Sequence, residues 1–135
     1  MTKLTALTAF LLNLNLFAAE NMESFVDDLT VLPAGRNTAT NGTIVVCEMD
    51  YTAVLFIERY PHASVPAPLL FAQISAWLLQ NDPDRTEANT FPVTVDILDD
   101  ATADLEIRIP FTEIITAEED TGGPIDIGGT RYALS

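Results

Sequence analysis

The chain has 135 residues, 48% of them hydrophobic, so it can form one domain with its own core and is too apolar for a disordered tail. Twenty acidic residues against six basic ones give a formal net charge of −14. Such a protein repels phosphate backbones, which excludes sequence-specific binding of nucleic acid but still allows an acidic wall along a passage for DNA.

The N-terminal segment has a basic start, an apolar middle and small residues after it, as a secretory signal does. Against a signal, Asn13 and Asn15 interrupt the apolar run, and bulky Phe17 would lie three residues before the cleavage site. Leucines recur at helical spacing, at Leu4, Leu7, Leu11 and Leu14. We therefore predict an amphipathic helix over 2–14 with Thr2 as its N-cap, and no membrane span, which needs about 18 apolar residues.

A weakly patterned region and a turn follow. Residues 17–26 are predicted to be irregular or weakly helical, and 27–35 contain a short strand ended by proline and glycine. The polar loop 36–43 holds Asn41-Gly42, a strong turn signal. The same asparagine begins a glycosylation acceptor motif, but the turn is favoured because no secretion signal is predicted.

Residues 44–60 are predicted to form a long strand. Its odd positions line one face with Met49, Tyr51, Ala53, Leu55 and Ile57. Val54 and Phe56 make the other face apolar as well, which favours a central strand covered on both sides. After a proline-rich turn, apolar residues at helical spacing predict a second helix over 67–81.

The loop 82–90 leads to a predicted β-hairpin over 92–111. One face of the hairpin is apolar on both strands, with Val93, Val95, Ile97, Leu105, Ile107 and Ile109. We expect this face to be buried against the two helices. Asp99-Asp100 should begin the turn, where aspartate bonds nearby backbone N–H groups.

The segment after the hairpin is acidic and rich in glycine. Glu118, Glu119 and Asp120 adjoin paired glycines, so we expect an exposed, mobile loop. It is either a flexible connector or an interface that orders against a basic patch on a partner. Residues 124–134 could hold a last strand, bent or turned at a second pair of glycines.

Together these elements predict an α+β fold. Four or five strands, in a mixed or antiparallel sheet, are expected to pack against two main helices. We expect a single domain over 1–135, in which residues 117–135 form a C-terminal extension.

The sequence offers no credible active site. Carboxylates are frequent around the hairpin, at Asp96, Asp99, Asp100, Asp104, Glu106 and Glu113. Their order does not match an EF-hand loop, which favours a structural role. His62 has no second histidine for a zinc set or a Ser-His-Asp triad, and Cys47 beside Glu48 is expected to be an inert core thiol. Trp77 is expected to be core, and we predict no enzyme activity, no cofactor and no metal site.

Several stretches resemble one protein family. They are "MDYTAVLFIERY", "PLLFAQISAWLLQNDPDR" and "FPVTVDILDDATADLEIRIPFTEII", with "MTKLTALTAFLL" at the start similar as well. The most specific parts are the helix with Trp77 and the run 96–100 leading into Thr112-Glu113. Over most of residues 1–116 the chain resembles the tail completion protein R (GpR) family of temperate contractile-tailed phages.

The resemblance implies a structural protein that completes or caps the phage tail and prepares it for head joining, without catalysis. Proteins with this task typically form a ring, often of six subunits, on the tail tube. The implied partners are further copies of the chain, tail tube or sheath proteins, and head–tail connector proteins. The implied location is the virion tail, after assembly in the cytoplasm of the bacterial host.

Two other functions remain open at this point. A small intracellular binding or regulatory module would have a pocket between sheet and helix, lined by Trp77 and Phe56. An acidic hydrolase would bring together in one cleft two of the carboxylates Asp96, Asp104, Glu113 and Glu118. Neither alternative explains the family resemblance.

Overall fold

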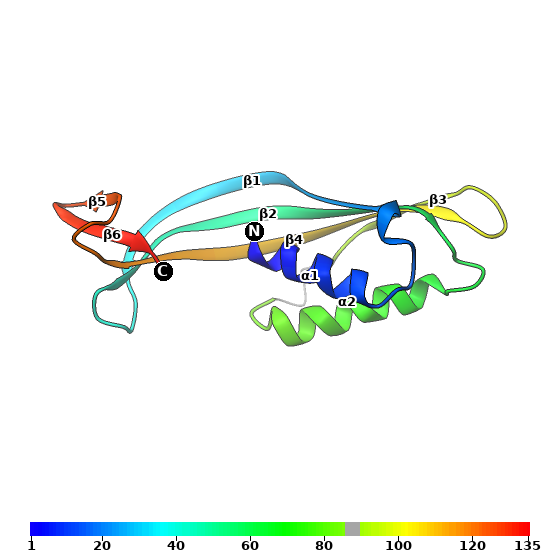
Figure 1. The fold of residues 1–135 in the computed structure, drawn as a ribbon, viewed down its shortest axis with the longest axis horizontal. Coiled ribbons are helices and arrows are strands. Elements are labelled where there is room, and N and C mark those ends of the chain that lie inside the picture. The colour runs from blue at the N-terminus through cyan, green and yellow to red at the C-terminus, as the bar shows by residue number, and fades with distance from the viewer. Residues whose placement is uncertain (86–89) are drawn as a thin grey trace. The chain divides into compact units, whose positions relative to one another are not determined.

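The computed structural model describes residues 1–85 and 90–135, so part of the predicted loop 82–90 lies outside the described residues. Two α-helices, one short 3₁₀ helix and six strands follow one another (Figure 1): α1 (Thr2–Asn13), η1 (Ala19–Asn21), β1 (Met22–Asn37), β2 (Thr43–Tyr60), α2 (Ala67–Asn81), β3 (Val93–Ile97), β4 (Ala103–Glu119), β5 (Ile125–Ile127) and β6 (Thr130–Leu134).

The strands form a sheet in the order β1-β2-β4-β6-β5, and β3 pairs with β4. Antiparallel pairing joins β3 to β4, β4 to β6 and β5 to β6. The predicted α+β class with two main helices is confirmed. The described residues form six strands, one more than the upper end of the predicted four or five, because 124–134 makes two strands around its paired glycines.

The chain divides into two compact units, which we describe separately. The first unit contains residues 1–27 and 52–111, and the second contains 28–51 and 112–135. The long strands β1, β2 and β4 each contribute to both units. Asp28, where β1 enters the second unit, has a φ of 54°, a left-handed conformation that aspartate adopts more readily than most residues.

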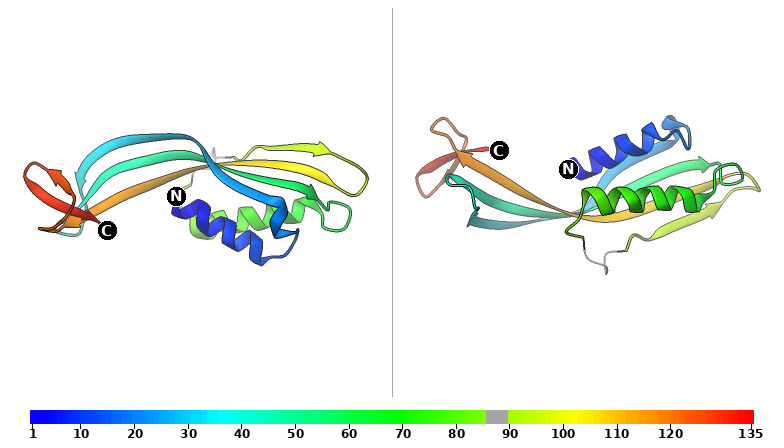
Figure 2. Two further views of the ribbon diagram at one scale, coloured as in Figure 1. Left: turned by 45° about the horizontal axis from the view of Figure 1, so that its top comes forward. Right: turned by 90° about the horizontal axis from the view of Figure 1, so that it is seen from below.

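In the first unit, both helices lie on the same side of the strands (Figure 2). The periodic residues of each helix point into the core, as predicted: Leu4, Leu7 and Leu11 from α1, and Leu70, Ile74, Trp77 and Leu78 from α2. Trp77 meets Phe111 of β4 edge-on, with ring centroids 6.4 Å apart. Trp77 is therefore a core residue, as predicted.

The helix bounds agree with the sequence, but one cap does not. Pro66 is the N-cap of α2 and a second proline occupies its first turn, the position where a missing N–H loses nothing. The predicted N-cap Thr2 is wrong: the cap is Met1, and Thr2 is the first helical residue. No side-chain hydrogen bond is made at that cap.

The hairpin has the predicted alternation but only half of the predicted burial. Val95 lies directly across from Leu105, so the two side chains share a face. Leu105, Ile107 and Ile109 are fully buried, whereas Val95 and Ile97 are 51% and 62% exposed. The prediction that the β3 face is buried is wrong for Val95 and Ile97, because among the described residues β3 pairs only with β4 and it lies beyond the helices (Figure 2).

The prediction for 44–60 is also half correct. β2 lies between β1 and β4 and is therefore central, as expected. The helices cover one side of it in the first unit and not both sides (Figure 2). On the face that was expected to be covered as well, Val54 is fully buried and Phe56 is half-buried.

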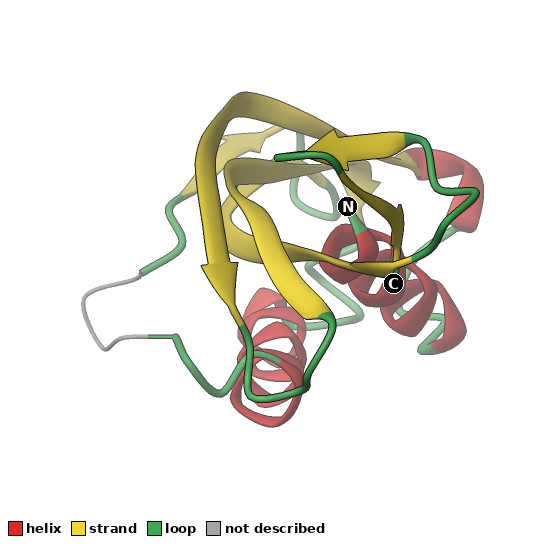
Figure 3. Ribbon diagram, turned by 90° about the vertical axis from the view of Figure 1, so that its left-hand side faces the viewer, coloured by secondary structure: helices red, strands yellow, loops and turns green. Residues whose placement is uncertain are grey.

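In the second unit, the described residues form strands and loops and no helix (Figure 3). β6 pairs with the end of β4, and β5 pairs with β6 in register from Ile125–Tyr132 to Ile127–Thr130. Gly128 and Gly129 join them with φ values of 60° and 86°, as the predicted turn requires.

β1 is much longer than predicted, with 16 residues from Met22 to Asn37. It includes residues 22–26, expected to be irregular, and the first two residues of the expected loop. Pairing with β2 supplies the regularity that the local pattern lacks. Pro33 is tolerated because β1 is an edge strand, and the predicted turn at Gly42 is confirmed with a φ of 80°.

Candidate functional site

The carboxylates of the hairpin are placed as surface and turn residues. Asp96 and Asp104 are cross-strand partners on β3 and β4. Asp96 is exposed, and Asp104 accepts the backbone N–H of Arg59 at 3.0 Å. Two like charges opposite one another are mildly unfavourable, which this pair tolerates because Asp96 is exposed to water.

Asp99 organises the turn between β3 and β4, as predicted. Its Oδ1 accepts the N–H groups of Ala101 at 2.9 Å and Thr102 at 2.6 Å. These backbone hydrogen bonds, with a third from the Thr102 hydroxyl, lower the pKa of the Asp99 carboxyl. His62, half-buried in its turn, has Nε2 3.3 Å from the Asp99 carbonyl oxygen. This is a structural turn.

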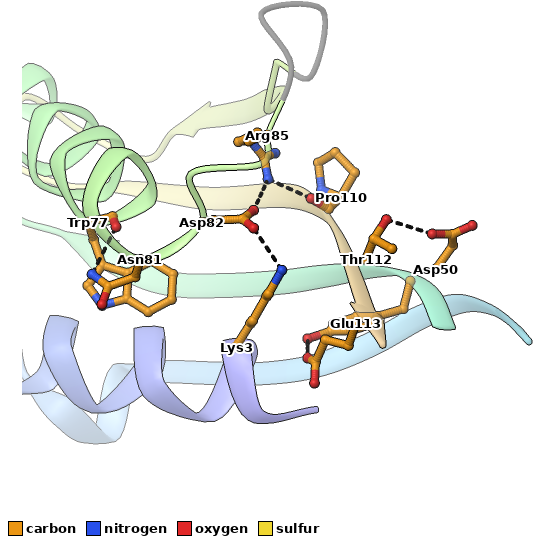
Figure 4. Close-up of polar contacts among 10 residues, drawn as sticks. Lys3, Asp50, Trp77, Asn81, Asp82, Arg85, Pro110, Thr112 and Glu113 are labelled. Atoms are coloured by element: carbon orange, nitrogen blue, oxygen red, sulfur yellow. Dashed lines mark hydrogen bonds and ion pairs between the residues drawn. The ribbon is translucent and has the colours of Figure 1, made fainter. Parts of the chain in front are cut away.

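Glu113, one of the carboxylates that a hydrolase would bring into a cleft, is instead buried in the second unit. Glu113 of β4 is 8% exposed and accepts a hydrogen bond from the hydroxyl of Tyr51 on β2. Next to it, the Thr112 hydroxyl donates to Asp50 Oδ1 at 2.6 Å. These paired side chains link β2 to β4 (Figure 4).

Sequence reasoning missed the strongest charged cluster, which lies in the first unit. Asp82, at the C-terminal end of α2, is 6% exposed. Lys3 Nζ of α1 lies 2.7 Å from its Oδ1, and Arg85 Nη1 lies 3.0 Å from its Oδ2 (Figure 4). Arg85 also donates to the Pro110 carbonyl at 2.7 Å. This cluster joins both helices to β4.

The contacts of this cluster indicate a structural role. Both carboxylate oxygens of Asp82 are engaged, one by Lys3 and the other by Arg85, so the carboxylate serves to hold these two side chains. The Arg85 guanidinium lies 5.7 Å from the centre of the Phe111 ring, a cation–π contact that fixes it against β4. No local pattern indicates this arrangement, because Lys3 and Asp82 are 79 residues apart.

The four carboxylates named for a hydrolase are divided between the two units. Asp96 and Asp104 belong to the first unit, and Glu113 and Glu118 to the second. Glu118 lines a shallow hollow with Glu119 and the turn 40–43, and none of the other three lines it. Within residues 1–85 and 90–135, no group of three or more metal-binding side chains could hold an ion. Cys47, expected in the core, is only half-buried.

The predicted interface residues lie at the end of β4. The side chains of Glu118, Glu119 and Asp120 are exposed, as expected. The expected mobile loop is wrong for the two glutamates, which lie in β4 and pair with Ala133 and Tyr132 of β6. Asp120 begins a turn in which its Oδ1 accepts the N–H of Gly122 at 2.9 Å. The three carboxylates are thus carried by ordered backbone.

A comparison with protein families identifies the chain. The family described as "P2 phage tail completion protein R (GpR)" matches residues 1–133. The chain belongs to this family. A protein of Haemophilus phage HP1 (strain HP1c1), named "Uncharacterized 19.2 kDa protein in rep-hol intergenic region", is 38% identical over 131 residues. That alignment covers 95% of this chain and 78% of the relative. No solved structure gave a significant match.

Membership of the GpR family confirms the predicted resemblance and extends it to residue 133. The family consists of structural tail completion proteins and is not a family of enzymes. The protein therefore acts in phage tail assembly and contacts tail components. No helix in the described part of the chain is long and apolar enough to cross a membrane.

Proposed function

We propose that this protein forms a ring that caps the phage tail and prepares the tail for joining to the head. The observation that carries the proposal is the match of residues 1–133 to the tail completion family. The ring would meet the tail tube or sheath on one face and head–tail connector proteins on the other. It would assemble in the cytoplasm of the bacterial host and remain in the virion tail.

The charge of the protein supports this role. A ring of subunits that each carry a net charge of −14 would present an acidic lumen. DNA would pass along such a wall without adhering to it, because both surfaces are negative. The same charge opposes the assembly of the ring, so subunit contacts must overcome repulsion between copies.

We expect ring formation to depend strongly on salt. Salt screens exposed charges over about 10 Å at 0.1 M, so repulsion between subunits should fall as ionic strength rises. Analytical ultracentrifugation at several salt concentrations, with and without tail tube protein, should show a discrete larger species that grows with salt. A chain that sediments only as a monomer, at every salt and protein concentration and with tube protein present, contradicts the ring.

We also propose that Glu118, Glu119 and Asp120 contact a basic patch on a tail partner. Their ordered positions at the end of β4 support this, because an ordered interface loses less entropy on docking than a mobile loop. Complementary charges would mainly speed and orient the encounter. The alternative is that these residues are merely solvated.

Replacing these residues by Ser, Ser and Asn tests the contact. The asparagine keeps the oxygen that accepts the Gly122 N–H, so the turn should survive. We expect fewer completed virions or aberrant tail lengths in complementation of a deletion phage, with an unchanged melting temperature. The control replaces three exposed carboxylates of the first unit, Asp84, Asp96 and Asp100, by Asn.

Both triple variants change the formal net charge by the same amount, from −14 to −14 + 3 = −11. A defect confined to the first variant therefore reflects the position of the charge and not its amount. If the first variant complements fully over a range of salt, the three residues are solvated surface and the docking contact is discarded.

A further inference from the structure

The second unit leaves many of its large apolar side chains exposed. Among its described residues, the buried apolar side chains are Ile44, Val45, Tyr51 and Ala117. The exposed large apolar side chains, at 40–68% exposure, are Leu29, Val31, Leu32, Ile114, Ile127 and Leu134. The described residues of the unit form no helix that could cover these side chains. The unit therefore exposes apolar surface suited to burial by another chain.

Four of these six exposed apolar residues lie on the two strands that end the sheet order. β1 ends the strand order on one side and β5 ends it on the other, and both edges belong to the second unit over 28–37 and 125–127. Leu29, Val31 and Leu32 lie on the first edge, and Ile127 lies on the second. Edge strands with exposed apolar side chains are templates for pairing with another chain.

The charges at the two edges fit each other. Residues 29–35 carry no charge, in a protein with a net charge of −14. Another acidic chain meets less repulsion on this stretch than on a surface of carboxylates. Arg36 follows the uncharged stretch; it pairs with Glu48 at 2.6 Å but keeps half of its side chain exposed, and the β5 edge carries exposed Asp126. Opposite charges on the two edges favour contact between unlike edges.

We propose that a second copy of this chain pairs its β5 edge, Ile125–Ile127, with the β1 edge, Leu29–Gly35. The contact is heterologous, joining different surfaces of the two copies, so repeating it around an axis closes a ring in which neither edge stays open. An unrelated partner strand would cover one edge and leave the other exposed. This inference rests on the proposed ring and names the contact that builds it.

Cross-linking of mixed cysteine variants tests the contact. In a Cys47→Ser background, one variant carries Val31→Cys and another carries Ile127→Cys. The two are mixed at low salt, assembled by raising the salt and treated with a short flexible bis-maleimide, which tolerates uncertainty in register. We expect covalent dimers in the mixture and only monomers when either variant is treated alone. Mass spectrometry should locate the link between residues 31 and 127.

The matched control replaces Val31→Cys in the mixture by Leu79→Cys, an exposed position (80%) on α2 in the first unit. This mixture should give no covalent dimers. Dimers from Val31→Cys alone would mean that two β1 edges meet across a two-fold axis, and equal yields with Leu79→Cys would mean random collision. Either result overturns the proposal.

The failure of this contact can be told apart from the failure of the ring. A sedimenting ring without the expected cross-link places the subunit contact elsewhere, which overturns the edge pairing and leaves the proposed function intact. A chain that remains monomeric with tail tube protein present contradicts both. Covalent capture of the tube protein by Val31→Cys, in place of a second copy, also overturns the edge pairing.

A pair of lysine substitutions provides a second measurement. Val31→Lys places a charge on the apolar edge and should weaken self-association at least roughly tenfold, the effect of about 1.4 kcal/mol. Thr30→Lys adds the same charge at the next residue, on the opposite face of β1, and should leave association unchanged or slightly stronger. Equal association of the two variants at matched salt overturns the proposal.

Discussion

Ile107→Asp is expected to unfold the first unit. Ile107 is fully buried in β4, on the apolar face that packs toward the helices. Its removal from the core loses about 1.5–3 kcal/mol of burial, and an unpaired buried carboxylate adds several kcal/mol more. The sum is comparable with the 5–15 kcal/mol that stabilises a typical domain. Far-UV circular dichroism and a thermal melt should show loss of the cooperative transition.

The hairpin offers a matched control for this substitution. Ile97→Asp makes the same chemical change in the partner strand, but Ile97 is 62% exposed. It should change the free energy of unfolding by no more than about 0.5 kcal/mol. A folded Ile107→Asp protein with an unchanged melting temperature would show that the hairpin is assigned wrongly. Unfolding by both substitutions would show that the β3 face is covered in solution.

The parts of the fold that the sequence predicted well are those with a local repeating pattern. The leucine spacing of α1 and the alternation at 103–111 depend only on residues a few positions apart. The same holds for the turns at Gly42 and Gly128-Gly129, because a positive φ is a property of the residue itself. Such features need no knowledge of distant partners.

Burial could not be predicted in the same way. Alternation shows that Val95 and Leu105 share a face, and their direct pairing confirms it. It does not show whether anything covers that face, so one residue is buried and the other is half exposed. The predicted length of β1 was wrong for a related reason: its extended conformation depends on pairing with β2 and not on a pattern in its own sequence.

At the candidate interface, composition predicted the exposure of the side chains but not the structure of the backbone. Three adjacent carboxylates beside glycines are typical of a mobile loop, and their exposure was predicted correctly. The pairing of Glu118 and Glu119 with β6 depends on backbone hydrogen bonds, which charge does not reveal. The burial of Asp82 was missed: it was predicted only as part of the loop 82–90, and one of its two cationic partners, Lys3, is 79 residues away.

Asp82→Ala is expected to lower the free energy of unfolding by about 3 kcal/mol. Removing one member of a buried ion cluster typically costs about 3–5 kcal/mol, because the remaining charges lose their compensation. Part of this loss is offset, since a carboxylate at the C-terminal end of a helix opposes the helix dipole by about 0.3–1 kcal/mol. Chemical denaturation at neutral pH measures the difference. Asp84→Ala, an exposed carboxylate two residues away, is the control and should be nearly neutral.

A double-mutant cycle isolates the contribution of the ion pair between Lys3 and Asp82. Lys3 is 28% exposed at its side chain and Arg85 only 11%, so Arg85 should carry the larger share. Lys3→Ala, Asp82→Ala and the double variant should give a coupling energy of about 1 kcal/mol, because the pair is partly solvated. Zero coupling would mean that Lys3 contributes nothing to joining α1 to the end of α2. If Asp82→Ala lowers the free energy of unfolding by less than about 1 kcal/mol, the cluster does not stabilise the packing of the helices on the sheet.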